Sequence, residues 1–161
     1  MLIQKKKILR LSVLAAIAVM FLLGGSSSSF AQHKKYSAKD MPSGVVESFT
    51  KLYPTSQITG YDIEKEDGNT FYEIQSKEGS MNRDAQYTSD GKLVSVEESM
   101  NLSDLPAEVT AAINSKYPKA KITKAERITK GSETNFEVLI KSKKKKIELL
   151  INSKGDILST E

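Results

Sequence analysis

The chain has 161 residues, with 24 Lys or Arg against 20 Asp or Glu, and it contains no cysteine. The lack of cysteine excludes disulfides, thiolate metal sites and thiol nucleophiles, and a single histidine leaves few options for a catalytic base. The positive charge does not indicate nucleic-acid binding, because four basic residues and no acidic ones precede residue 32, which leaves the rest of the chain formally neutral. We therefore expect no nucleic-acid partner.

The first 31 residues have the pattern of an export signal. A basic stretch precedes an apolar run of 13 residues, 11–23, and Ser29 and Ala31 place small side chains at positions −3 and −1 of a cut before Gln32. The run is shorter than the roughly 20 residues that span a bilayer. We predict a cleaved signal peptide, a periplasmic or secreted protein, and no stable membrane span after cleavage. The alternative is an uncleaved membrane anchor.

The remainder of the chain repeats itself at an offset of 64 residues without a gap. Both copies contain Pro-x-x-Val followed by a Tyr-Pro pair, Tyr53-Pro54 in one and Tyr117-Pro118 in the other. Chance supplies scattered identities but not both motifs in one register, so we interpret the pattern as an internal duplication. The predicted parts are a signal peptide over 1–31, a mobile lead-in over 32–39, a first repeat over 40–98, a linker over 99–103 and a second repeat over 104–161.

Each repeat is predicted to hold one helix followed by a four-stranded antiparallel sheet. Val45, Phe49 and Tyr53 follow the i, i+4, i+8 spacing of an amphipathic helix, which Pro42 opens as its first residue and Pro54 ends. Alternating residues and glycine-containing turns then indicate strands. The expected strands include 57–66, 70–76 and 93–96, with 135–141 and 157–159 in the second copy. The fold class is α+β, and the pattern leaves open whether the two sheets join.

No catalytic site is expected. The one histidine, His33, lies in the lead-in, where nothing holds it near a nucleophile. Glu73 and Glu137 are equivalent in the two repeats, but alternation places each on the outer face of its own sheet, whereas acid/base carboxylates must lie a few ångströms apart. We interpret the chain as non-enzymatic. A small carboxylate enzyme stays as an alternative, because the sequence does not give distances between carboxylates.

Metal and cofactor binding are not expected either. Borderline metals need several His or Cys ligands. Asp62, Glu64, Glu66 and Asp67 could form a calcium site, but the glycine and glutamate spacing of an EF-hand is missing. We interpret these four residues as the solvated end of a hairpin and predict no metal and no cofactor.

Two groups of residues are candidates for contact with a partner. The first is apolar and should point away from the helix of each repeat, which is typical of a partner surface: Phe71, Leu139 and Leu150. The alternative is that the two repeats pack together and bury these side chains. The second group is a predicted hairpin tip that could bind polyanions such as lipopolysaccharide phosphate, or that only prevents aggregation of strand edges: Lys143, Lys144, Lys145 and Lys146.

The repeated motifs carry a family resemblance. The first copy reads Met41-Pro-x-x-Val45-x-x-x-Phe49-x-x-x-Tyr53-Pro54, then Phe71-Tyr72-Glu73-Ile74 and Ser89-Asp-Gly91-Lys-Leu93. The second copy reads Leu105-Pro-x-x-Val109-x-x-x-Ile113-x-x-x-Tyr117-Pro118, then Phe136-Glu137-Val138 and Ser153-Lys-Gly155-Asp-Ile157. The pattern resembles the PepSY-like family, the β-lactamase-inhibitor-like domains of exported bacterial proteins.

The resemblance implies a function as well as a fold. It implies tandem helix-plus-four-strand units, as in the β-lactamase inhibitory protein, whose concave sheet grips an enzyme, while related PepSY domains restrain peptidases. We therefore expect an exported binding module for an extracytoplasmic protein or peptide, with a peptidase or other envelope enzyme as the preferred target class. The alternative is an envelope-surface or polyanion binder that uses Lys143–Lys146. The family's motif residues are structural, so they assign no functional residue here.

Overall fold

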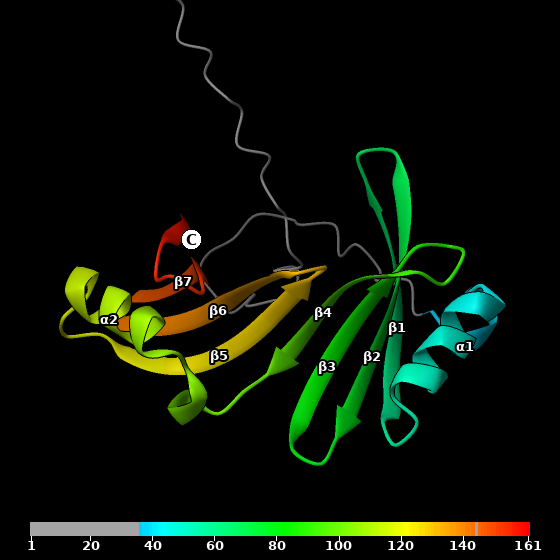
Figure 1. Cartoon of the computed structure of the whole chain (residues 1–161), viewed down its shortest axis with the longest axis horizontal. Coiled ribbons are helices and arrows are strands. Elements are labelled where there is room, and N and C mark those ends of the chain that lie inside the picture. Colours follow the sequence, from blue (N-terminus) through cyan, green and yellow to red (C-terminus); the bar gives the residue numbers. More distant parts are fainter. Residues whose placement is uncertain (1–35, 144) are drawn as a thin grey trace, which may run out of the picture. The chain divides into compact units, whose positions relative to one another are not determined.

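The computed structural model describes residues 36–143 and 145–161, which form two helices and one antiparallel sheet of eight strands (Figure 1). The predicted signal peptide, its cleavage site between Ala31 and Gln32, and His33 lie outside these residues. Neither helix in the described part of the chain has the length and apolar character needed to cross a lipid bilayer. Within the predicted lead-in, Ala38–Asp40 form a short 3-10 helix, where the Asp40 carboxylate accepts a hydrogen bond from the Ser37 amide at 2.9 Å.

Both repeats have the predicted order of one helix and four strands. The first repeat consists of α1 (Ser43–Leu52), β1 (Gln57–Glu66), β2 (Asn69–Glu78), β3 (Met81–Tyr87) and β4 (Leu93–Ser99). A 3-10 helix (Leu102–Asp104) precedes the second repeat, which consists of α2 (Ala107–Lys116), β5 (Lys121–Lys130), β6 (Glu133–Ser142), β7 (Lys145–Asn152) and β8 (Ile157–Thr160).

Each helix begins one residue after the proline that was expected to open it. Pro42 and Pro106 have ψ angles of 140° and 147°, which are extended, so each proline caps its helix instead of forming its first turn. At the other end, the Tyr53 amide donates to the Phe49 carbonyl at 2.8 Å and the Tyr117 amide donates to the Ile113 carbonyl at 2.7 Å. The following prolines have no amide hydrogen with which to continue the pattern, as predicted.

The four-stranded sheet predicted for each repeat is corrected to one eight-stranded sheet that the repeats share, so the two sheets, whose joining the sequence left open, do join. The strands follow the chain order from β1 to β8, and β4 pairs antiparallel with β5 from Val96↔Thr129 to Ser99↔Glu126. This pairing is possible because β4 runs three residues beyond its predicted end at Val96. Two separate sheets would each leave an edge of unpaired amide and carbonyl groups, and the pairing of β4 with β5 satisfies them.

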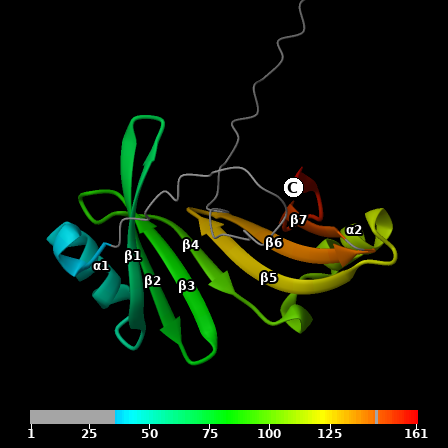
Figure 2. The same ribbon diagram turned by 180° about the vertical axis from the view of Figure 1, so that it is seen from behind.

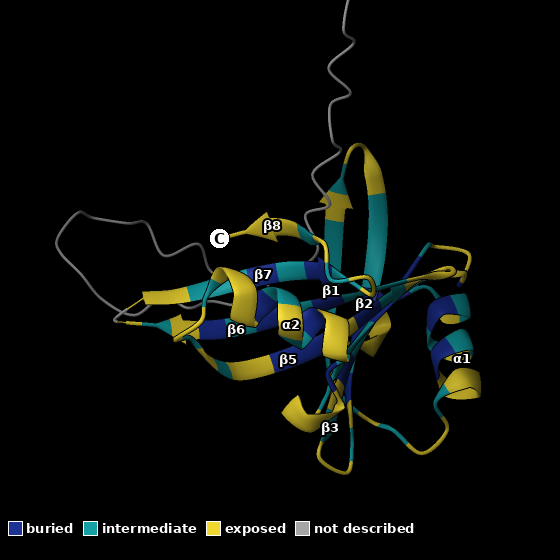
Figure 3. Ribbon diagram, turned by 60° about the vertical axis from the view of Figure 1, so that its left-hand side comes forward, coloured by how far each residue is buried: buried dark blue, intermediate teal, exposed yellow. Residues whose placement is uncertain are grey.

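Both helices pack on the same face of the sheet, over two separate hydrophobic cores. Val45 and Phe49 of α1 pack with residues of β2, β3 and β4, and Val109 and Ile113 of α2 pack with residues of β5, β6 and β7. Val96, in the first core, is paired with Thr129, which points to the same side of β5 as Ala125 in the second core. Figure 3 shows the buried positions on α1 and α2 and along the strands that they cover.

Glycine turns hold the β3–β4 and β7–β8 hairpins against the helices. Gly91 and Gly155 have φ angles of 83° and 87°, in the left-handed region predicted for these turns. A Cβ atom at Gly91 would lie 2.4 Å from the Gly44 carbonyl oxygen, and one at Gly155 would lie 2.7 Å from the Glu108 carbonyl oxygen. The absence of a side chain therefore allows each turn to approach the backbone of its helix.

Candidate functional site: the far face of the sheet

The face of the sheet opposite the two helices, here called the far face, carries the three apolar residues expected to contact a partner. Phe71 lies opposite Glu64, Leu139 opposite Lys124 and Glu148, and Leu150 opposite Glu137, and all three side chains are partly exposed. Leu139 and Leu150 are diagonal neighbours on β6 and β7, but Phe71 lies on β2 in the other repeat. The repeats join edge to edge, so they do not bury these residues against each other.

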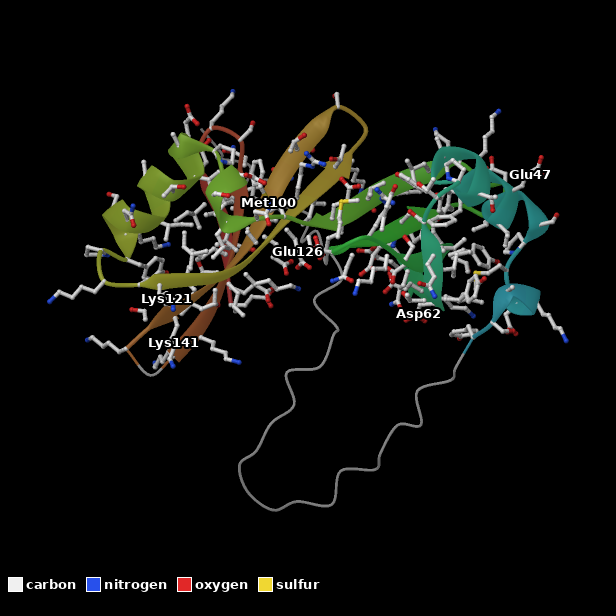
Figure 4. All side chains as sticks on the ribbon, turned by 90° about the horizontal axis from the view of Figure 1, so that it is seen from below. Glu47, Asp62, Met100, Lys121, Glu126 and Lys141 are labelled. Carbon is white, nitrogen blue, oxygen red and sulfur yellow. The ribbon has the colours of Figure 1, made fainter. Side chains whose placement is uncertain are left out.

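The far face also carries a diagonal set of carboxylates, one taken from each of β1 to β7 and one directly after β8. The strands run side by side in Figure 2, and Figure 4 labels Asp62 of β1 and Glu126 of β5. We call the set the acidic row, and its members from β1 to β8 are Asp62, Glu73, Asp84, Glu97, Glu126, Glu137, Glu148 and Glu161. Glu161 directly follows β8 and exchanges backbone hydrogen bonds of 2.9 and 3.0 Å with Glu148 of β7.

The members of the acidic row stand opposite each other in pairs on neighbouring strands. Asp62 pairs with Glu73, Asp84 with Glu97, Glu126 with Glu137 and Glu148 with Glu161. Each pair is displaced by two residues along the strand from the pair before it. Glu73 lies opposite Gln86, two residues beyond Asp84, and Glu97 lies opposite Ile128, two residues beyond Glu126. The row therefore crosses the sheet diagonally. Like charges directly opposite each other destabilise an antiparallel pair.

Of this row, only Glu73 and Glu137 were recognised from the sequence as equivalent in the two repeats and placed on the outer face of the sheet. The same 64-residue offset also relates Asp62 to Glu126, Asp84 to Glu148 and Glu97 to Glu161, so all four carboxylates of the first repeat recur in the second. Applying the offset to charged residues as well as to apolar ones would have found the row. The hairpin-end interpretation of Asp62 was wrong, because Asp62 and Glu64 lie within β1 and are partly buried.

Glu73 is the most deeply buried member, with 2 % of its surface exposed. Burial, together with the charges of the neighbouring Asp84, Glu64 and Asp62, raises its pKa to about 7, although one hydrogen bond from Gln75 acts to lower it. That bond, from Gln75 Nε2 to Glu73 Oε1, is 3.0 Å long. The other oxygen, Glu73 Oε2, has no hydrogen-bond partner among the described residues.

A second concentration of negative charge lies where the repeats join. Carboxylate oxygens of Glu97, Glu126 and Glu137 lie within 4.8 Å of one another, close enough for one divalent cation to contact all three. Burial and the nearby Glu126 and Glu137 raise the pKa of Glu97 to about 9, and burial with Glu148 and Glu126 raises that of Glu137 to about 7. Among the described residues these three carboxylates converge in this way, whereas Asp62, Glu64, Glu66 and Asp67, which the sequence analysis interpreted as no metal site, do not.

One lysine contacts this group. Lys124 Nζ lies 2.6 Å from Glu126 Oε2, and the Lys124 side chain is 57 % exposed whereas that of Glu126 is 11 % exposed. Although burial opposes it, the hydrogen bond with Glu126 and the charges of Glu97 and Glu137 raise the pKa of Lys124. The far face therefore holds an ammonium group in direct contact with the acidic row.

On the helix-bearing side, an ion-pair network fixes the junction of the repeats. Glu98 of β4 accepts from Arg83 Nε at 2.9 Å and from Arg127 Nη2 of β5 at 2.6 Å. Burial raises the pKa of Glu98, but the hydrogen bonds from the two guanidinium groups hold it below its ordinary value. Beside this network lies a groove of about 900 Å³ that is also lined by Met81, Met100 and Phe136.

The lysine-rich hairpin lies at another edge of the molecule. Lys143, which has a φ angle of 56°, lies in the turn between β6 and β7, and the exposed Lys145 and Lys146 are the first two residues of β7, while Lys144 lies outside the described residues. Lys146 is paired with Lys141, and Lys141 is paired with Lys121 on β5. Figure 4 shows Lys121 and Lys141 together, away from Glu126. Positive charge thus gathers at one end of the second repeat.

Comparison with known proteins gives one family and several structural neighbours. The model of the family described as "Putative beta-lactamase-inhibitor-like, PepSY-like" matches residues 28–95 and 79–159. A "putative periplasmic" protein of Bacteroides eggerthii is 17 % identical with a TM-score of 0.63, over 75 % of this chain and 88 % of that one. A BLIP-like protein of Bacteroides fragilis is 19 % identical with a TM-score of 0.58, over 75 % and 85 %. No functionally curated protein matches the chain. At these identities the structural neighbours support the fold.

Proposed function

Because this chain belongs to the PepSY-like, β-lactamase-inhibitor-like family, we propose that it is an exported, non-enzymatic module that binds an extracytoplasmic protein or peptide with the far face. The observation that carries the proposal is the far face itself, which holds the acidic row from β1 to the residue after β8 and three partly exposed apolar side chains. An exposed sheet face of mixed apolar and charged character is typical of a surface that binds a protein.

The proposed location and target class have separate support. The signal pattern of residues 1–31 and a structural neighbour described as periplasmic both favour a periplasmic or secreted protein. The family description favours an inhibitor of an enzyme, and we propose a peptidase or other envelope enzyme as the target class. We assign the carboxylates to binding, because the row extends across the whole sheet, from β1 to the residue after β8, and is not confined to the group of Glu97, Glu126 and Glu137.

Affinity capture from an envelope extract tests the proposal. The wild-type chain is immobilised beside the triple variant Phe71→Ser, Leu139→Ser, Leu150→Ser, and retained proteins are identified by mass spectrometry. The control replaces three exposed leucines elsewhere, Leu52, Leu102 and Leu158, with serine. We expect the control to retain the same protein as the wild type and the far-face variant to lose it while its circular dichroism is unchanged. Equal retention by both variants would refute the far-face assignment.

The alternative function, binding of polyanions, has one specific observation in its favour. The exposed Lys143, Lys145 and Lys146 surround the β6–β7 turn, and Lys121 and Lys141 extend this positive charge along the adjoining strands. Replacing Lys143–Lys146 with serine should release the protein from lipopolysaccharide or anionic vesicles if this function is correct. Unchanged retention on such material would exclude the alternative, without bearing on the far face.

A further inference from the structure

We infer that the partner presents lysine or arginine side chains, and that the acidic row is the surface on which they bind. This inference rests on the proposed function and specifies the chemistry of the partner. It commits to one occupant, a protein segment that carries several positive charges. Three observations support it: carboxylates that stand opposite each other in pairs, one buried carboxylate oxygen that has no hydrogen-bond partner among the described residues, and a contact that Lys124 already makes.

The first argument concerns the repeated pairing of like charges. Four pairs of carboxylates stand directly opposite each other across neighbouring strands, and each pair works against the stability of the sheet. The two repeats have the same four positions, although much of the remaining sequence differs between them. A positively charged partner would neutralise such pairs, so the arrangement has a use in the complex that it lacks in the free protein.

The second argument is the unpartnered oxygen of Glu73. Glu73 Oε2 accepts no hydrogen bond among the described residues, although only 2 % of the surface of Glu73 is exposed. Glu73 stands opposite Asp62 on the far face and experiences the charges of Asp62, Glu64 and Asp84, so its carboxylate faces into the acidic row. Buried acceptors are almost always satisfied. Its neighbours in the row are acceptors when ionised, so a hydrogen-bond donor must come from elsewhere.

The third argument is the contact of Lys124. Its ammonium group lies 2.6 Å from Glu126, which has two further carboxylates of the row within 4.8 Å. A guanidinium or ammonium group from a partner would make the same kind of contact with Glu97 and Glu137, and an arginine can bind a carboxylate through two parallel hydrogen bonds. The raised pKa values of Glu97 and Glu137 agree with this, because both groups would release protons when a cation binds.

The apolar residues of the far face fit the same partner. The partly exposed Leu150 stands opposite Glu137, so aliphatic surface adjoins this carboxylate. Lysine and arginine have long aliphatic stems that pack on apolar surface while the charged end reaches a carboxylate. The lysines at the end of the second repeat, Lys121, Lys141 and Lys146, would repel such a segment and confine it to the row.

Binding of a defined peptide tests the inference. The probe is a fluorescein-labelled peptide with six Gly-Arg repeats, and its counterpart has six Gly-Glu repeats; affinity is measured by anisotropy with the full chain at pH 7.5. The test variant is Glu97→Gln, Glu137→Gln. The matched control, Glu47→Gln, Glu108→Gln, makes the same two substitutions at exposed positions on α1 and α2. We expect the arginine peptide to bind, the test variant to weaken binding at least tenfold, and the control to change it less than twofold.

Each other result overturns the inference. Equal weakening by the two variants would mean that the peptide responds only to net charge. No binding of the arginine peptide, or equal binding of the glutamate peptide, would show that the row does not select cations of this kind. Binding of calcium chloride without binding of the peptide would make the row a divalent-cation site instead. If the peptide fails but capture still depends on Phe71, Leu139 and Leu150, the inference is refuted and the proposed function stands.

Discussion

Replacement of Glu73 by glutamine should stabilise the protein above neutral pH. Burial and neighbouring carboxylates raise the pKa of Glu73 from 4.5 to about 7, so the folded state binds the proton more tightly than the unfolded state. A carboxyl group with a raised pKa lowers stability once the pH exceeds the value of the unfolded chain, and the loss is complete above the value of the folded chain. Glutamine has the same shape without the charge.

The magnitude follows from the difference between the two pKa values. Each unit corresponds to about 1.4 kcal/mol, so the raised pKa of Glu73 lowers the free energy of unfolding by about 3 kcal/mol at pH 8 and by about 1 kcal/mol at pH 5. Glu73 is 2 % exposed, so solvent does not reduce this interaction. The variant keeps an oxygen to accept the hydrogen bond from Gln75. We expect a gain of about 2 to 3 kcal/mol at pH 8 and about 1 kcal/mol or less at pH 5.

Urea unfolding at pH 5 and pH 8, followed by circular dichroism, measures this gain. Glu47→Gln serves as the control, because Glu47 is exposed on α1. A Glu73→Gln protein that is equally stable or less stable than the wild type at pH 8 would refute the reasoning. So would a gain of the same size at both pH values, since a gain from packing would not depend on protonation.

Three further predictions concern the sheet, the junction and a turn. The wild-type protein should lose stability as the pH rises from 6 to 9, because its folded state holds protons on the acidic row that the unfolded state has released. Thermal unfolding at several pH values checks this, and an unfolding temperature that rises with pH would contradict it. Arg83→Met should lower the free energy of unfolding, measured in urea, by about 3 kcal/mol, because Arg83 is 5 % exposed and binds Glu98. A loss below about 1 kcal/mol would show that Arg127 alone satisfies Glu98. Gly91→Ala should destabilise the protein more than Gly68→Ala. Both glycines have positive φ angles, but a Cβ at Gly91 would clash with the Gly44 carbonyl, whereas one at Gly68 meets nothing within 4 Å. Equal urea midpoints for the two variants would argue against the contact between the turn and the helix.

The helices and strands could be predicted from the sequence because their signals are local. The spacing of Val45 and Phe49, the prolines that flank the helices, and the alternation along β2 and β6 each act within a few residues, and the duplication supplied each signal twice. The union of the two sheets was not predictable in this way. It depends on the pairing of β4 with β5, and the alternation in Leu93–Ser99 does not show which strand it will pair with.

The candidate site was predicted in part for a similar reason. Alternation placed Phe71, Leu139 and Leu150 on one face, but it could not show that Phe71 lies far from the other two. The cross-strand pairs of the acidic row depend on registers that bring together residues 11 to 13 positions apart, such as Asp62 with Glu73 and Asp84 with Glu97. Register between strands is set by the packed core and by turn geometry, which a reading of single positions does not include.

The central claim is that the far face binds the partner, and photo-crosslinking in the envelope tests it most directly. A photoreactive amino acid replaces Leu139 on the far face in one protein and Leu52, which is 51 % exposed on α1, in another. Both proteins are irradiated in living cells, and crosslinked products are detected on gels and identified by mass spectrometry. We expect a discrete crosslink to one envelope protein from position 139 and none to that protein from position 52. The reverse result, with the crosslink arising from position 52 alone, would contradict the account.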